Sequence, residues 1–163
     1  MSERYSVRVT KDYLVFAAAH FITYEGGVCE PLHGHNYRVA IEVEGPLDAH
    51  HLVFNFLVLK RMARDIVNRL DHRVLLPTEH PTIRVTHDEN EVSLTTPEGR
   101  YVLPRRDCVL LDVANTTAER LAWWICGQLR TRIAEETDAS LSRMRVEVEE
   151  TFGQWAHYEW TDA

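Results

Sequence analysis

The sequence predicts an α+β domain in which strands near both ends of the chain form an antiparallel sheet and two helices pack against it. Two observations lead to this class. Apolar and polar residues alternate near both ends of the chain, and two apolar stripes at helical spacing lie between those regions. Hairpin-paired strands with helices set apart from them are typical of α+β folds. The 163 residues correspond to a single domain, residues 1–163.

The N-terminal part of the chain predicts two long strands joined by a loop. Residues 5–19 are apolar and partly β-branched with stretches of period two, and residues 36–44 alternate strictly between two faces. Residues 22–32 contain a Gly-Gly pair and a proline, which predict a loop. A hairpin-like connection would return the chain at residues 33–35 beside the end of the first strand.

Two helices are predicted from their caps and apolar stripes. Asn55 is a suitable N-cap for a helix that ends near Leu70, with apolar residues three and four positions apart along it. The second helix begins at residues 116–119, where Thr116 and Glu119 have the spacing of a capping box. A further apolar stripe follows this signature, so the helix is expected to pack on the same sheet.

The remaining segments predict strands. Residues 82–103 indicate an extra small hairpin, because short β-rich segments are separated there by polar turns. Residues 108–113 form a short apolar strand, and residues 142–151 and 154–161 form two strands around the Phe152-Gly153 turn.

The composition excludes several classes of protein. A net charge of −7 disfavours non-specific nucleic-acid binding, so we expect no nucleic-acid partner. No apolar run approaches a membrane span and the first residues contain no apolar signal segment, so we expect no membrane association. Three cysteines are too few for a disulfide framework and suit a reducing compartment, which predicts a cytoplasmic location.

Nine histidines in a chain of this size raise the question of a metal. His33 and His35 are two residues apart, so on an extended backbone both imidazoles point to one side, and Gly34 leaves room for close approach. His20 ends the preceding predicted strand. Three neutral imidazoles are a known ligand set for catalytic zinc, although strand-end histidines with satisfied hydrogen bonds would show the same pattern.

Cys29 and the Asp71-His72 pair are candidates for proton transfer. Cys29 lies in the loop before His33, where a nearby cation would lower the pKa of the thiol; a buried, inert cysteine is the alternative. A histidine beside a carboxylate suits a general acid or base, but an ordinary helix C-terminus explains Asp71 and His72 equally well.

Glu150 has the parity of the apolar residues Met144, Val146 and Val148, so it is expected to point inward, whereas Glu149 is expected to point outward. An inward carboxylate needs hydrogen-bond donors, and a ligand with two N–H groups would supply them. Fraying of the strand at its end is the alternative. For Glu119, the capping box is by itself a sufficient explanation.

Five ordered elements of the chain resemble the 6-pyruvoyltetrahydropterin synthase / 6-carboxytetrahydropterin synthase family. They are FAAAH at residues 16–20, CEPLHGHNY at 29–37, LDH at 70–72, TAERLA at 117–122 and VEET at 148–151. The element from the cysteine to His-Gly-His is specific, and the five elements together cover nearly the whole chain in the family's order.

The resemblance implies a tunnelling fold, with a four-stranded antiparallel sheet, two helices on one face, and active sites between subunits of a homo-oligomer built as a dimer of trimers. It also implies a role for each matching residue. Zinc is held by His20, His33 and His35, the proton-transferring thiol is Cys29 with Asp71 and His72 as partners, and the pterin is bound by Glu150 with Thr117 and Glu119 nearby.

By this resemblance the substrate is 7,8-dihydroneopterin triphosphate. The step of four residues from Cys29 to His33 resembles the 6-carboxytetrahydropterin branch, which leads to queuosine precursors with loss of triphosphate and side-chain cleavage. Three alternatives stay open: a 6-pyruvoyltetrahydropterin synthase of the biopterin pathway, formation of 6-hydroxymethyl-dihydropterin through Glu30, and a non-catalytic pterin- or zinc-binding module.

The chain also departs from the family pattern. Residues 82–106 are longer than the usual connection, Asn55 stands where aspartate is frequent, and Thr116 stands where proline is frequent. An acidic chain that binds a triphosphate needs local basic groups, for which the candidates are Arg73, Arg105, Arg106 and Arg120.

Overall fold

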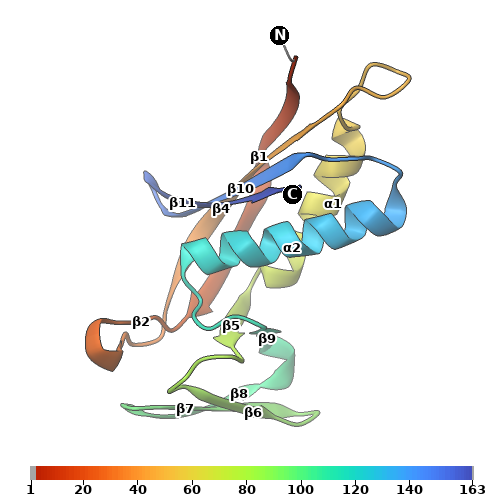
Figure 1. Cartoon of the computed structure of the whole chain (residues 1–163). Coiled ribbons are helices and arrows are strands. Elements are labelled where there is room, and N and C mark those ends of the chain that lie inside the picture. The colour runs from red at the N-terminus through yellow and green to blue at the C-terminus, as the bar shows by residue number, and fades with distance from the viewer. Residues whose placement is uncertain (1–2, 163) are drawn as a thin grey trace.

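The computed structural model describes residues 3–162, and its centre is a six-stranded sheet with the strand order β11-β10-β4-β1-β5-β9 (Figure 1). The four strands predicted to form an antiparallel sheet do so, which confirms the α+β class. The expected number of four strands is wrong, because the sheet contains two more short strands. The first, β5, pairs in parallel with β1, and the second, β9, pairs in parallel with β5. In chain order the six are β1 (Tyr5–His20), β4 (His33–Gly45), β5 (Arg73–Pro77), β9 (Cys108–Leu111), β10 (Arg143–Thr151) and β11 (Gln154–Thr161).

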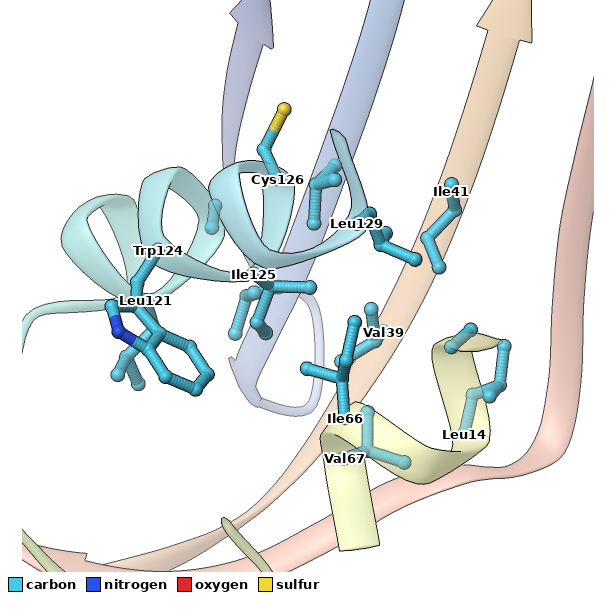
Figure 2. Close-up of a cluster of buried hydrophobic side chains, with 14 of the residues drawn as sticks. Leu14, Val39, Ile41, Ile66, Val67, Leu121, Trp124, Ile125, Cys126 and Leu129 are labelled. Atoms are coloured by element: carbon cyan, nitrogen blue, oxygen red, sulfur yellow. The ribbon is translucent and has the colours of Figure 1, made fainter. Parts of the chain in front are cut away.

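Both predicted helices, α1 (Phe56–Leu70) and α2 (Ala118–Glu136), are present and pack on the sheet (Figure 1). The side chain of Asn55 caps α1 by accepting a hydrogen bond from the amide of Leu57 at 2.8 Å. Figure 2 shows side chains of α1 and α2 converging on Val39 and Ile41 of β4, and these residues belong to one continuous core. Burial of this core is the main source of stability.

The segment between the helices forms a small sheet of its own. The predicted extra hairpin is a three-stranded antiparallel sheet, which we call the accessory sheet: β6 (Arg84–His87), β7 (Glu91–Thr96) and β8 (Gly99–Pro104). The predicted loop at 22–32 contains a short hairpin whose strands have two residues each, β2 (Thr23–Tyr24) and β3 (Val28–Cys29), with the 3₁₀ turn η1 (Glu25–Gly27) between them. A second 3₁₀ turn, η2 (Arg105–Asp107), precedes β9. The accessory sheet and the β2–β3 hairpin lie at the same end of the molecule (Figure 1).

An irregularity in β1 decides which of its residues face the helices. The pairing of β1 with β4 shifts between Thr10 and Val15. Val9 is buried before the shift, whereas after it the even-numbered residues Leu14, Phe16, Ala18 and His20 are buried. A bulge changes the parity of a strand in this way, and here it turns His20 toward the interior.

Within residues 3–162, neither helix combines the length and the apolar character that crossing a membrane requires.

Candidate metal centre

Three histidine side chains meet where β1 ends and β4 begins. His20 is the register partner of His33, and Ala18 is the partner of His35, so both strands deliver their imidazoles to one place. One ring nitrogen from each of the three lies within 4.8 Å of the others. His20 is fully buried, while His33 and His35 are half-buried. The structure therefore brings together the three residues that the sequence singled out as metal ligands.

Backbone carbonyl groups fix which nitrogen of these rings is free. The Nδ1 of His20 donates to the carbonyl of Thr116 at 2.9 Å, and the Nδ1 of His33 donates to the carbonyl of Pro31 at 2.8 Å. Since a carbonyl oxygen only accepts, both Nδ1 atoms carry the proton, and a neutral ring then has its lone pair on Nε2. Such anchoring of the second nitrogen is typical of metal-ligating histidines.

Burial keeps His20 in the neutral form. Desolvation lowers the pKa of His20 to about 4; the hydrogen bond to Thr116 opposes this, and the neighbouring imidazoles add to it. The Nε2 atoms of His20 and His33 lie 3.2 Å apart. Two unprotonated nitrogens at that distance repel each other unless a proton or a cation lies between them, so the arrangement suits a bound cation.

Glu150 supplies a carboxylate to the same place. Its Oε1 lies 3.8 Å from the Nε2 of His20 and 4.0 Å from the Nε2 of His35. This oxygen is buried and has no hydrogen-bond partner among the described residues. Desolvation, and then the charge of Glu150, raise the pKa of Tyr37, whose hydroxyl lies 3.2 Å from the Nε2 of His20. An orphaned buried carboxylate oxygen points to a partner bound from outside the chain.

Glu149 departs from the expectation that it points to solvent. It is only 4% exposed, and its carboxylate accepts a hydrogen bond from the amide of Gly153 at 2.7 Å. Arg38 lies 3.8 Å from the same carboxylate. The pairing of β10 with β11 is irregular between Glu149 and Thr151, and the tight turn that follows covers the outward side chain. The two adjacent glutamates therefore differ in hydrogen bonding. The carboxylate of Glu149 has a donor within the chain, whereas the buried Oε1 of Glu150 has none among the described residues.

A second carboxylate approaches the histidines from the loop. The Oε2 of Glu30 lies 3.4 Å from the Nε2 of His33. Three imidazoles, of which His20 and His33 have free Nε2 atoms, and two nearby carboxylates form a donor set that fits a divalent cation of the kind imidazole prefers, zinc among them. The residues present therefore fit the metal expected from the sequence.

Cys29 lies in β3 and is buried in an apolar cluster separate from the main core. Its thiol donates a weak hydrogen bond to the carbonyl of Glu30, with the two heavy atoms 3.6 Å apart. Burial, and after it the charge and hydrogen bonding of Glu98, raise the pKa of this thiol. The surrounding protein groups thus act against the lowering of the pKa that we expected for a reactive cysteine.

Thr117, Glu119 and Glu150 line one surface depression together with Ile22 and Ala156. The residues that the resemblance assigns to substrate binding therefore lie next to one another and beside the histidines. The capping box predicted for Thr116 and Glu119 is wrong. The N-cap of α2 is Thr117, whose hydroxyl accepts from the amide of Arg120 at 3.4 Å.

Thr116 has a different task. It is fully buried, its hydroxyl donates to the carbonyl of Phe21 at 2.8 Å, and its own carbonyl anchors His20. Glu119 is consequently not occupied in a cap.

Asp71 and His72 form the predicted pair. The carboxylate of Asp71 lies 2.9 Å from the Nδ1 of His72 and accepts from the amide of Ala17 at 2.8 Å. Burial opposes ionisation of Asp71, but these hydrogen bonds outweigh it and lower the pKa of its carboxyl group. The side chain of His72 is 81% exposed. It borders a depression that is also lined by Ala17, Ala18, Ala19, Gly34, His35 and Asn36.

The candidate arginines each have a partner within the chain. Arg105 donates to the carbonyl of Cys108, Arg106 pairs with Asp107, Arg73 donates to the carbonyl of His72, and Arg120 stacks over the ring of Trp123.

Sequence reasoning missed two residues near Cys29, namely Glu98 and His80. Neither carries a local signal, because their partners lie 69 and 57 positions away in the chain.

Comparison with known proteins gives a consistent answer. A family model described as 6-pyruvoyl tetrahydropterin synthase matches residues 8–161. A putative 6-carboxy-5,6,7,8-tetrahydropterin synthase from Pyrococcus abyssi is 33% identical over 134 residues, covering 82% of this chain and 78% of that protein. A dihydroneopterin monophosphate aldolase from Pyrococcus furiosus is 40% identical over 60 residues, covering 37% of this chain and 50% of that protein.

Among solved structures, the 6-pyruvoyl tetrahydropterin synthase of Plasmodium vivax superposes with a TM-score of 0.89 at 27% identity, covering 99% of this chain and all of that one. That enzyme has also been solved as variants of a glutamate described as a catalytic residue.

Proposed function

The chain belongs to the 6-pyruvoyl tetrahydropterin synthase family, and on this premise we propose that it is a zinc-dependent 6-carboxytetrahydropterin synthase acting on 7,8-dihydroneopterin triphosphate. The observation that carries the proposal is the histidine triad with the orphaned Glu150 beside it and Cys29 in the preceding hairpin. The name of the Pyrococcus abyssi relative favours the 6-carboxy product over the 6-pyruvoyl product. Cysteine usage supports a cytoplasmic location for this activity.

In this proposal each side chain has a task set by its chemistry. His20, His33 and His35 would hold zinc, which would supply Lewis-acid polarisation of oxygen atoms of the substrate side chain. The carboxylate of Glu150 accepts the paired N–H groups of the pterin, and this fixes the reacting carbon beside the triad. Thr117 and Glu119 line the same depression and complete the polar wall around the pterin. Cys29 exchanges protons with the substrate carbon atoms as triphosphate leaves.

The position of His72 supports an oligomeric active site. The side chain of His72 is 81% exposed, and it borders the depression that Ala17, Ala19, Gly34 and His35 also line. In this proposal, the Asp71-oriented imidazole that assists Cys29 comes from a second copy of the chain. We therefore propose a homo-oligomer with sites between subunits, arranged as a dimer of trimers.

Product identification tests the proposal. Zinc-loaded protein is incubated with 7,8-dihydroneopterin triphosphate, and the pterin products and acetaldehyde are followed by mass spectrometry. We expect 6-carboxytetrahydropterin with release of acetaldehyde. A product that keeps its whole carbon side chain indicates 6-pyruvoyltetrahydropterin synthase activity, and no conversion by metal-loaded protein overturns the proposal.

Glu30 supports a second candidate, cleavage of the side chain to 6-hydroxymethyl-dihydropterin. Its carboxylate lies 3.4 Å from the metal-facing nitrogen of His33 and can act as a base there. The partial match to the Pyrococcus furiosus aldolase favours this activity, and the Plasmodium vivax enzyme shows that a glutamate can be a catalytic residue in a similar protein. The variant Glu30→Gln distinguishes the two: it removes this product if Glu30 is the base, whereas Cys29→Ala leaves it in place.

A further inference from the structure

The β2–β3 hairpin carries Cys29, and both of its strands are held by one stretch of the chain. This stretch, which we call the accessory segment, consists of the accessory sheet and the loop before it and runs from His80 to Pro104. Thr23 and Cys29 are register partners across the hairpin. On one side, the Nε2 of His80 lies 2.6 Å from the hydroxyl of Thr23. On the other side, the amide of Cys29 donates to the Oε1 of Glu98 at 3.4 Å. Two contacts from one accessory segment thus fix both strands of a hairpin that has only two residues per strand.

The tautomer of His80 is set by its own loop. Its Nδ1 accepts from the amides of Thr82 at 3.0 Å and Ile83 at 2.9 Å. Since an amide only donates, Nδ1 is unprotonated and Nε2 carries the proton toward Thr23. The carbonyl of Thr23 also accepts from the side chain of Asn115 at 2.9 Å. The strand opposite Cys29 is therefore fixed through both its backbone and its side chain.

The turn that carries Glu98 is also fixed. The hydroxyl of Thr96, a buried residue, accepts from the amide of Gly99 at 3.2 Å and lies 3.3 Å from its carbonyl, so that it closes the turn between β7 and β8. Pro97 restricts the backbone within that turn. Beneath the turn, the ring of Tyr101 in β8 contacts Phe21 at a centroid distance of 4.8 Å. The accessory sheet and the hairpin therefore share one apolar cluster.

The charges that face the thiol come from two elements. Glu98 approaches from the accessory sheet, and Glu30 follows Cys29 in the chain. The other titratable groups of the same apolar cluster are Cys108 and the half-buried Tyr101. Burial and these two carboxylates all disfavour the thiolate.

We propose that the accessory sheet is a platform that positions Cys29, and that Glu98 is its positioning residue: the carboxylate fixes the Cys29 amide and places a negative charge beside the thiol. The proposal rests on the proposed function, because it assigns Cys29 the proton transfer. It gives residues 82–106 a role, because Glu98 within this segment contacts the hairpin at Cys29. The charge of Glu98 favours the thiol form of Cys29 over the thiolate.

Residue-specific alkylation tests the proposal without using turnover. Iodoacetamide reacts with the thiolate, so the modification of the Cys29 peptide, followed by mass spectrometry across a range of pH, gives the midpoint of its ionisation. Glu98→Gln keeps a hydrogen-bond acceptor but removes the charge, and we expect the midpoint to fall by about one pH unit. Glu89→Gln, in the exposed turn on the other side of β7, is the matched control and should leave the midpoint unchanged.

Activity provides the second measurement. We expect Glu98→Ala, which removes both acceptor and charge, to lower kcat about tenfold with KM within about twofold, and Glu98→Gln to restore much of kcat. The proposal is overturned if both variants keep the midpoint and kcat of the parent protein, or if Glu89→Gln has the same effects. A shifted midpoint in a protein that converts no pterin triphosphate overturns the proposed function but retains the contact between Glu98 and the thiol.

Discussion

The Nε2 atoms of His20 and His33 face each other at 3.2 Å while both Nδ1 atoms donate to backbone carbonyl groups. This relationship leaves two lone pairs directed at one point, and the third imidazole and Glu150 lie around the same point. The three imidazoles and Glu150 are therefore arranged to hold a cation.

Removing one imidazole should abolish stabilisation by metal. At a zinc concentration one hundred times its dissociation constant, binding to the folded state contributes about 2.7 kcal/mol, which corresponds to a rise in Tm of about 5–10 °C. We expect His33→Ala to lose this rise, as measured by thermal denaturation with and without zinc after chelation. His157→Ala, on an exposed position of β11, should keep it. An equal zinc-dependent rise in the His33→Ala protein argues against the triad as the site.

Gly34 should tolerate no side chain. A Cβ at this position would lie 2.7 Å from the carbonyl oxygen of Ala18, so that β1 and β4 would have to separate beside the histidines. We expect Gly34→Ala to lower the free energy of unfolding by about 1–3 kcal/mol in urea denaturation of metal-free protein. Gly127→Ala, in α2 where nothing crowds a Cβ, should instead raise it by about 0.5–1 kcal/mol. Equal effects at both positions contradict the close approach of the strands.

Substitutions of the two adjacent glutamates should have different effects: the change at Glu149 should lower stability, and the change at Glu150 should weaken pterin binding. Glu149→Ala leaves the amide of Gly153 without its acceptor, and we expect a loss of about 1–2 kcal/mol in the free energy of unfolding. Glu150→Gln breaks no hydrogen bond of the buried Oε1 atom within the described residues, so stability should hold while binding of 7,8-dihydroneopterin weakens about tenfold or more. Calorimetric titration and urea denaturation of both variants measure the two effects. Unchanged pterin affinity in Glu150→Gln removes Glu150 from the pterin site.

Active sites that are shared between copies of the chain predict that two inactive variants restore activity when they assemble together. Cys29→Ala and His72→Ala each should lack activity alone, because each removes one partner of the proton transfer. When the two variants are dissociated and reassembled together, half of the copies carry Cys29 and half carry His72, so about a quarter of the shared sites contain both and should be active. Recovery of turnover after mixing is the measurement. No recovery in verified mixed oligomers indicates that both residues act within one chain.

The periodicity of the sequence determined the secondary structure around the site. Alternation at residues 36–44 and stripes at helical spacing depend on neighbours two to four positions apart, so they identified β4, α1 and α2 directly. The same local rule placed His33 and His35 on one side of β4 and indicated the inward direction of Glu150. Local patterns did not specify β5 and β9 as parallel additions to the sheet, since pairing across an edge depends on where distant segments pack.

What the sequence determined by itself is the set of chemical groups: three imidazoles, a thiol and carboxylates, in an order that resembles one family. The tertiary structure decided how those groups act together. The bulge between Thr10 and Val15 turns His20 inward, the carbonyl of Thr116 fixes its tautomer, and the accessory sheet brings Glu98 to Cys29. These partners lie 69 and 96 positions apart in the chain. Contacts over such separations are set by packing of the whole core, which no local periodicity records.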